Sequence, residues 1–331
     1  MSSAAKLDVL GVGNAIVDVL AETDDAFLAA NGVTKGAMTL IDTPRAQALY
    51  AAMPPGIEAS GGSAANTMAG IASLGGKCAY IGKVSSDQLG EVFAHDIRAI
   101  GVDFHSRPFT QGEPTARCLI LVTPDAQRSM NTYLGASSYL DESDLDPALI
   151  ASAQITYLEG YLFDRPDAKA AFFAAAKIAH EAGRKVALTL SDAFCVSRHH
   201  AEFTQLVGHV DILFANETEA AELTGEKDFD AAVKALAAKC PTVCVTHGPK
   251  GSVIAANGQI HRIAAAPVAK VVDTTGAGDL YAAGVLYGIT AGLDLPAAGR
   301  IGSIAAAEVI SHLGPRPQKS LKAMLPRASE L

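Results

Sequence analysis

The chain has 331 residues, of which 49% are hydrophobic and 18% charged, and its formal net charge is −9 at pH 7. This composition supports a sizeable buried core, argues against disorder, and suits one large domain with an appendage or two domains. Because no long basic run is present, non-specific nucleic-acid binding is disfavoured, whereas a small anionic substrate held by a few local donors is not excluded.

Five cysteines (Cys78, Cys118, Cys195, Cys240 and Cys244) are scattered along the chain without a C-x-x-C pair. Their odd number and their spacing favour buried free thiols in a reducing cytosol over disulfides or a zinc site. The first residues lack the apolar region of a signal peptide, and no uncharged apolar stretch reaches membrane-spanning length. We therefore expect a cytoplasmic protein with no membrane partner.

The first predicted strand, residues 7–12, contains Gly11 and leads to Gly13, and these two glycines begin a dinucleotide-binding fingerprint. Ile16 stands where that motif needs its third glycine for close helix–strand packing, so a nicotinamide cofactor is disfavoured. Asp18 follows within an apolar run. An acid there is either exposed on a strand face or binds a substrate hydroxyl, and the pattern alone favours exposure.

Residues 37–41 predict a short strand, which is followed by a helix from Pro44 to about Ala52. The glycine-rich run 60–66 then leads into an apolar helix over residues 68–74. Two interpretations of this run stay open. It is either a loop with Ser63 as the helix N-cap, or a backbone that approaches a ligand, with Asn66 able to donate and accept hydrogen bonds.

No phosphate-binding P-loop is present around Lys77, although two glycines precede this residue. Cys78 stands where that motif needs Ser or Thr, and Gly70 and Gly75 lie one residue out of register. Any ATP must therefore be held in another way.

A β-hairpin is predicted by two strands, 116–123 and 128–134, which flank a turn at 124–126. We expect it to join the strand at 37–41 in a small sheet apart from the main body. From residue 155 onward, strands and helices alternate along the chain. This alternation indicates a parallel sheet with helices on both faces, in which ligands bind beyond the carboxyl ends of the strands.

Two motifs follow strands of this expected parallel sheet. Asn216 and Glu219 come after a strand at 210–214 and share one face of a helix. They either order waters around Mg²⁺ or form an exposed helix cap. The run 246–251 follows a strand at 242–246, and it is either a hairpin turn or a glycine-opened nucleotide site.

A third motif covers residues 271–279, where a β-branched strand end leads into a glycine turn and then into an apolar helix over 280–293. The first N–H groups of such a helix have no partner within it, and Gly276 and Gly278 let an anion approach them. Asp279 is then either a helix-cap residue or the base for phosphoryl transfer to an alcohol, with the amides holding the phosphoryl charge.

Together these motifs resemble those of the PfkB, or ribokinase-like, carbohydrate kinase family. The run Asp-Thr-Thr-Gly-Ala-Gly-Asp at 273–279 looks like its C-terminal signature, and Gly-Gly-Ser-x-x-Asn at 61–66 looks like its N-terminal one. Asn-x-x-Glu at 216–219 matches its magnesium-associated motif. The resemblance extends from Gly11 to about Pro317, and runs at 13–18, 128–136 and 216–220 resemble the adenosine kinase branch.

The resemblance implies a ribokinase-like α/β fold with a central, mostly parallel sheet flanked by helices. Residues 1–14, 61–106 and 139–331 would form a large nucleotide-binding and catalytic domain. Residues 15–60 and 107–138 would form a small β-sheet lid over the substrate site.

The resemblance also implies roles for particular residues. Asp279 would be the catalytic base, and the amides of Gly276, Ala277 and Gly278 would form an anion hole. Glu219 and Asn216 would hold Mg²⁺ through water. Residues expected along the ATP are Asn216, Thr246, Gly248 and Gly251. Residues expected to contact the substrate are Asp18, Met38, Gly61, Gly62, Asn66, Arg128, Tyr161, Leu162 and Phe163, with Arg128 as a phosphate contact. Asp273 and Thr275 would be candidate ligands for the potassium ion that some members bind.

The implied activity is ATP-dependent phosphorylation of the primary (5′) hydroxyl of a ribonucleoside, adenosine first, as in purine salvage. A sugar kinase (ribokinase or fructokinase) stays open, because the sequence shows no clear aromatic pair for a purine. A second alternative is a non-catalytic nucleotide or sugar sensor on the same fold. The expected partner is a small molecule, and the oligomeric state stays open between a monomer and a dimer formed through the lid-sheet edge.

Overall fold

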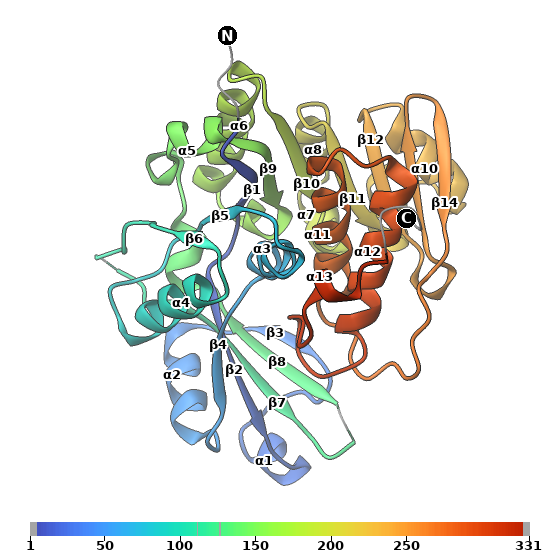
Figure 1. Ribbon diagram of the computed structural model, residues 1–331. Helices are drawn as coiled ribbons and strands as arrows, with labels where there is room; N and C mark the ends of the chain where they lie inside the picture. The colour runs from blue at the N-terminus through green and yellow to red at the C-terminus, as the bar shows by residue number, and fades with distance from the viewer. Residues whose placement is uncertain (1–4, 111, 126, 327–331) are drawn as a thin grey trace.

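Two β-sheets organise the residues that the computed structural model describes, which are 5–110, 112–125 and 127–326 (Figure 1). The larger sheet has nine strands with helices on both faces, and the smaller sheet has five strands. The predicted α/β class, with a mostly parallel central sheet and a second small sheet, is confirmed. The predicted turn residue Ala126 and the predicted domain ends at 1–4 and 327–331 lie outside the described residues.

The strands of the large sheet are β1 (Leu7–Val12), β5 (Cys78–Ile81), β6 (Asp103–Phe104), β9 (Ala153–Glu159), β10 (Lys185–Thr189), β11 (Ile212–Asn216), β12 (Thr242–Thr246), β13 (Ser252–Ala256) and β14 (Gln259–Ile263). Their order is β14-β13-β12-β11-β10-β9-β1-β5-β6. All neighbours are parallel, except that β13 is antiparallel to both β12 and β14. Parallel strands are buried on both faces, which explains apolar runs such as that of β12.

Helices cover both faces of the large sheet because successive side chains of a strand point to opposite sides. In β10, Val186 and Leu188 join one cluster of buried side chains, and Ala187 joins the other. The first cluster is covered by α5 (Pro147–Ser152), α6 (Pro166–Glu181), α7 (Ala193–Arg198), α8 (His200–Val207), α9 (Glu217–Thr224) and α10 (Phe229–Ala237). The second is covered by α3 (Ser63–Leu74), α4 (Gln88–Ala99), α11 (Ala277–Thr290), α12 (Leu295–Val309) and α13 (Leu321–Met324).

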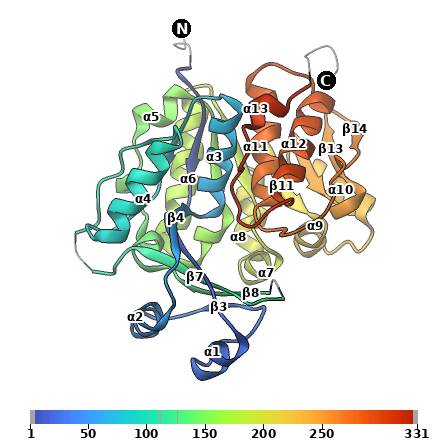
Figure 2. The same ribbon diagram turned by 60° about the horizontal axis from the view of Figure 1, so that its bottom comes forward.

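The small sheet contains β2 (Ile16–Glu22), β3 (Met38–Leu40), β4 (Ile57–Gly61), β7 (Ala116–Val122) and β8 (Arg128–Tyr133). Its order is β3-β8-β7-β2-β4, so the predicted hairpin forms and pairs with the predicted 37–41 strand. Helices α1 (Asp25–Ala30) and α2 (Thr43–Ala52) lie on the side of this sheet that faces away from the large sheet (Figure 2). The opposite face of the small sheet is therefore left to meet the large sheet.

Some local predictions are wrong. Val271 and Val272 were predicted to end a strand, but both are exposed in a connection between β14 and α11. Strand propensity reflects packing on a half-buried sheet, and this connection has no sheet neighbour. The N-cap of α3 is Gly62 rather than Ser63. The five cysteines are all buried and unpaired, as predicted.

Within the described part of the chain, none of the helices combines the length and the apolar character that crossing a bilayer requires.

Candidate active site

A cavity of about 1000 Å³ lies between the small sheet and the carboxyl ends of strands in the large sheet. Asp18 and Met38 line it from the small sheet, and Asn216 and Thr246 line it from the ends of β11 and β12. The cavity therefore lies beyond the strand ends, where the sequence predicts that ligands bind. Predicted site residues on the cavity wall are Asp18, Met38, Gly62, Asn66, Tyr161, Asn216, Glu219, Thr246, Thr275, Gly276, Ala277, Gly278 and Asp279.

The Asp279 carboxylate lies where the first turns of α3 and α11 meet. It accepts hydrogen bonds from Ser63 Oγ at 2.6 Å and from Asn66 Nδ2 at 3.1 Å. Burial raises the pKa of Asp279, and these two donors partly oppose the rise. A carboxylate whose pKa moves toward neutrality is a better proton acceptor at physiological pH than an exposed aspartate.

The glycine turn before Asp279 is shaped by close packing as well as by backbone conformation. Gly276 is the N-cap of α11 and has φ +80°, a region that favours glycine. A Cβ on Gly276 would lie 2.6 Å from the carbonyl oxygen of Pro315. Ala277 N–H donates to the Thr274 carbonyl at 3.2 Å, so it would have to give up this bond to hold an anion. Gly278, in contrast, has open space where a side chain would be.

Asp18 lies on β2 with its carboxylate against the backbone of Gly61, where a Cβ would come within 2.4 Å of Oδ2. It lines the cavity, so the interpretation of Asp18 as an exposed strand residue is wrong. Burial raises the pKa of Asp18 to about 6, Arg316 and Arg128 lower it, and Asp279 raises it further. Asp18 therefore ionises close to physiological pH.

Asn216 and Glu219 cap α9 reciprocally. Glu219 accepts from Asn216 N at 2.9 Å and from Asn216 Nδ2 at 2.7 Å, so each carboxylate oxygen already has a donor. Burial raises the pKa of Glu219 to about 7, and the nearby charges of Asp192 and Asp279 raise it too, although the Asn216 N–H opposes them. This excess of negative charge and the oxygen-rich donor set fit Mg²⁺.

Magnesium would be held through water. Among the described residues, no three His, Cys, Asp or Glu side chains converge as a direct metal site.

Potassium ligands were expected at Asp273 and Thr275, and the structure gives these side chains other partners. Arg128 NH1 lies 2.6 Å from Asp273 Oδ2 and 3.4 Å from Thr275 Oγ1. Asp273 Oδ2 also accepts from Gly314 N, and Oδ1 accepts from Thr275. A guanidinium supplies the positive charge here, so these residues as arranged do not fit a potassium ion.

Arg128 itself lies beside the cavity rather than on its wall. Its side chain is 9% exposed, and its Nε and NH2 have no hydrogen-bond partner among the described residues. These two buried donors remain available for an anion.

Two predicted substrate contacts are corrected, because Leu162 and Phe163 lie in the hydrophobic core. Phe163 stacks on Phe203 with ring centroids 4.2 Å apart. The short 3₁₀-helix Gly160–Asp164 places Tyr161 and Asp164 on the cavity wall, but neither Leu162 nor Phe163.

The run 246–251 forms the turn between β12 and β13, as the hairpin interpretation predicts. A Cβ on Gly251 would lie 2.0 Å from the Ile263 carbonyl, so this glycine is needed for packing against β14. Gly248 and Gly251 are not on the cavity wall, which Thr246 reaches.

Sequence reasoning missed several residues of the site. Arg316 Nε donates to Asn66 Oδ1 at 3.3 Å, and its NH1 donates to Ser60 Oγ at 2.6 Å and Asp96 Oδ2 at 3.2 Å. No motif in the sequence marks Arg316, because it lies 250 positions from Asn66.

Glu159 and Phe194 were also missed. Glu159, at the buried end of β9, accepts from Asn14 and from Ala64 N, and burial raises its pKa to about 7. Phe194 is 65% exposed and lines the cavity, with the Arg198 guanidinium 4.5 Å from its ring centroid. An acid that ends an apolar strand was a readable signal for Glu159, whereas a single Phe in a helical segment was not.

Comparisons with known proteins show the family of this chain. The family model described as pfkB family carbohydrate kinase matches residues 57–321. An adenosine kinase from Sinorhizobium meliloti is 53% identical, with a TM-score of 0.89 over 97% of this chain and 98% of that one. A probable sugar kinase from Rhizobium etli is 50% identical, with the same TM-score and coverage.

Similarity extends to a sugar kinase and an adenosine kinase of other organisms. A probable chloroplastic fructokinase from Arabidopsis thaliana is 32% identical over 273 residues, which are 78% of this chain and 70% of that protein. The adenosine kinase of Saccharomyces cerevisiae is 28% identical over 328 residues, 92% and 95% of the two chains. The chain therefore belongs to the pfkB family of carbohydrate kinases and is a phosphotransferase whose acceptor is an alcohol group.

Proposed function

We propose that the protein transfers the γ-phosphoryl group of ATP to the primary (5′) hydroxyl of a ribonucleoside, adenosine first. The observation that carries the nucleoside is the exposed apolar surface that Phe194, Tyr161 and Met38 present to the cavity. Phe194 is 65% exposed in the cavity, so its ring keeps free surface besides its contact with the Arg198 guanidinium, and a flat purine would cover that surface. The 53% identity to the Sinorhizobium meliloti adenosine kinase supports the same substrate.

In the proposed mechanism, Asp279 takes the proton of the 5′ hydroxyl as that oxygen attacks the γ-phosphorus. The bond to the bridging oxygen of ADP breaks as the new ester forms. N–H groups of the Gly276–Gly278 turn and the free donors of Arg128 hold the charge on the phosphoryl oxygens. Asp18 and Asn66 accept hydrogen bonds from the ribose hydroxyls and fix the 5′ oxygen beside Asp279.

Family membership implies ATP as the phosphate donor, typically with Mg²⁺. We assign Asn216 and Glu219 to the metal through water, and it would neutralise phosphate charge during the transfer. Thr246, at the end of β12, is the assigned protein contact along the nucleotide.

Residues 15–60 and 107–138 act as the lid in this proposal, over a large domain of residues 1–14, 61–106 and 139–331. The inner face of the small sheet contributes Ile16, Cys118 and Ile120 to the cavity wall. Closure of an apolar face over the substrate would exclude water and limit wasteful hydrolysis of ATP.

A sugar kinase remains the second candidate, because the Arabidopsis relative is a probable fructokinase. A coupled ADP-release assay with adenosine, inosine, guanosine, ribose and fructose separates the two. We expect adenosine to give the highest kcat/KM. The variant F194A should lower kcat/KM for adenosine about tenfold or more, since stacking on a base contributes roughly 1–3 kcal/mol. A higher kcat/KM for ribose or fructose than for adenosine would refute the nucleoside assignment.

The pKa of Asp18 predicts an acidic limit on activity. As the pH falls through about 6, this carboxylate gains a proton and accepts substrate hydroxyls less well. We expect kcat/KM for the nucleoside to fall about tenfold for each pH unit below that point. A pH–rate profile in a constant-ionic-strength buffer measures this.

Protonation of Asp18 itself would not unfold the protein. The pKa of Asp18 is raised in the folded state, so between 3.8 and about 6 its protonation on acidification favours the folded protein. The variant D18N, which cannot titrate, should have low kcat/KM at every pH and lack this limb of the profile. An unchanged limb in D18N would assign it to another group.

A further inference from the structure

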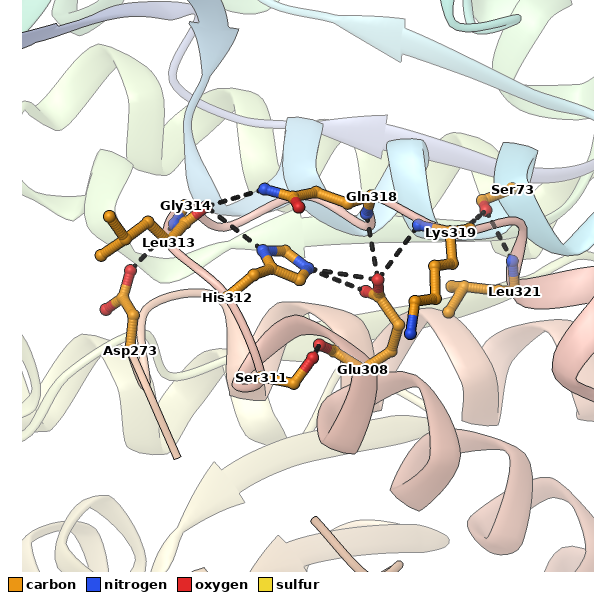
Figure 3. Close-up of polar contacts among 10 residues, drawn as sticks. All are labelled: Ser73, Asp273, Glu308, Ser311, His312, Leu313, Gly314, Gln318, Lys319 and Leu321. Carbon is orange, nitrogen blue, oxygen red and sulfur yellow. Dashed lines mark hydrogen bonds and ion pairs between the residues drawn. The ribbon is translucent and has the colours of Figure 1, made fainter. Parts of the chain in front are cut away.

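Glu308, near the end of α12, is a buried carboxylate whose partners all come from the segment that follows it. Its side chain is 1% exposed. Its two oxygens lie 3.2 and 3.1 Å from His312 Nε2, and Oε1 also accepts from the backbone N–H groups of Gln318 and Lys319 at 3.1 Å (Figure 3). A single side chain therefore holds both ends of residues 312–319, called here the 312–319 segment.

The middle of the 312–319 segment is tied to the loop that precedes α11. Gly314 N donates to Asp273 Oδ2 at 3.0 Å, and Figure 3 shows Asp273 near Gly314, with Glu308 toward Gln318 and Lys319. Val272 N also donates to the Ile310 carbonyl at 2.8 Å. The segment thus lies between α12 and the loop that leads to the glycine turn. The Glu308 carboxylate holds it to α12, and the Asp273 carboxylate holds it to that loop.

This segment brings two groups to the active site. Pro315 lines the cavity, and its carbonyl oxygen occupies the space beside Gly276 where a Cβ would lie. Arg316 donates to Asn66 Oδ1, and Asn66 Nδ2 in turn donates to Asp279 Oδ2. A displacement of the segment therefore reaches the amides of the glycine turn through Pro315 and the base through Arg316.

We propose that Glu308 is a positioning residue for phosphoryl transfer. By fixing the 312–319 segment, it holds Pro315 against Gly276 and Arg316 against Asn66, and so sets the distance between the base and the amide donors. Glu308 does not touch the cavity, and it acts through these two residues. The inference rests on the proposed function of the Asp279 site.

The test is the variant E308A, which removes every acceptor that the side chain supplies. We expect kcat to fall about 100-fold at a temperature below its unfolding midpoint, because a misplacement of about 1 Å has that effect on positioned groups. The variant E308Q should recover most of the turnover. Its amide oxygen can accept from Gln318 and Lys319, and its NH₂ can donate to a neutral His312 imidazole.

Asp211 offers a matched control, because it lies just before β11, at the end of the large sheet away from the cavity. It accepts from His180 Nε2 at 2.9 Å and from Val186 N at 2.8 Å, so it joins a histidine and a backbone N–H as Glu308 does. We expect D211A to lower the unfolding midpoint and to leave kcat of the folded enzyme unchanged. An E308A variant that behaves like D211A would overturn the proposal.

Hydrogen–deuterium exchange of the peptide covering 273–279 gives a second readout that does not depend on the substrate. E308A should accelerate exchange there, whereas D211A should not. Wild-type protein that releases no ADP with nucleosides, together with this acceleration in E308A, would refute the nucleoside assignment and support the positioning role. If the 273–279 peptide of E308A exchanges at the wild-type rate, the positioning role is refuted. If E308A does not fold, E308D and H312A replace it, and unchanged kcat in both refutes the proposal.

Discussion

Replacing Asp279 by asparagine is expected to lower kcat by roughly 10³-fold, because the base and the group that orients the attacking hydroxyl are lost together. Ser63 Oγ and Asn66 Nδ2 both donate to this carboxylate, and an asparagine can accept through one atom only. Steady-state ADP release with adenosine measures the change. The bound nucleoside should keep its affinity within a few-fold, since Asp18 and Asn66 hold the ribose in the proposed complex.

Stability provides the control for this variant. The raised pKa of Asp279 means that its ionised form is disfavoured in the folded protein. Removing the charge should therefore leave the unfolding midpoint unchanged or raise it, so that lost activity cannot be assigned to unfolding. Near wild-type turnover in a folded D279N variant would rule out Asp279 as the base.

Replacing Gly276 by alanine is expected to lower kcat by about 10²- to 10³-fold, the usual effect of losing one donor of an anion hole. Two features of the structure lead to this expectation. The residue has φ +80°, and its added methyl group would meet the carbonyl oxygen and Cα of Pro315 at 2.6 and 2.8 Å. Backbone atoms cannot rotate away as a side chain would, so either the turn or the Pro315 segment must shift.

Gly292 supplies the matched control for Gly276. It follows the other end of the same helix with φ +77°, and its added methyl group meets no atom within 4 Å. The variant G292A therefore carries the conformational strain without the collision. We expect G292A to lose about 1 kcal/mol of folding stability and to keep its turnover. Equal kcat values for G276A and G292A would show that contact with Pro315 does not shape the site.

The predicted motifs of the site are local, and this explains why the sequence revealed them. Each of the three motifs contains the start of a helix: 61–66, 216–219 and 273–279. At a helix start, glycines, amides and acids either cap the unpaired backbone N–H groups or bind a ligand there. Their chemistry therefore follows from residue type and spacing. All three starts reach one cavity. Only residues 216–219 follow a parallel strand of the large sheet, β11, whose carboxyl end lies at the edge where ligands bind. Residues 61–66 follow β4 of the small sheet, and residues 273–279 follow an irregular connection after β14, so the packing of the two sheets brings these two starts to the cavity.

Residues outside such motifs could not be assigned in the same way. Asp18 looked exposed because strand alternation does not reveal which face of a small sheet will be covered. Phe163 looked available to a substrate, and yet it stacks on Phe203 in the core. Phe194 gave no signal, and its exposure in the cavity depends on the packing of α7. Burial is a property of the neighbours, and these are distant in sequence.

The sequence by itself determined the alternation of strands and helices, the hairpin of the small sheet, and the positions of three glycine- or acid-rich helix starts. These features depend on contacts within a few residues, so hydrophobic periodicity and turn chemistry specify them. Only the tertiary structure decided which groups share the cavity and how their pKa values are shifted. Asp279 meets Ser63 and Asn66, Arg128 pairs with Asp273, and Glu308 holds the segment that carries Arg316. The contacts of Asp279 and of Arg128 join residues far apart in the chain, whereas Glu308 reaches Gln318 only 10 positions away, in a segment without regular secondary structure. Burial raises the pKa values of Asp18 and Asp279.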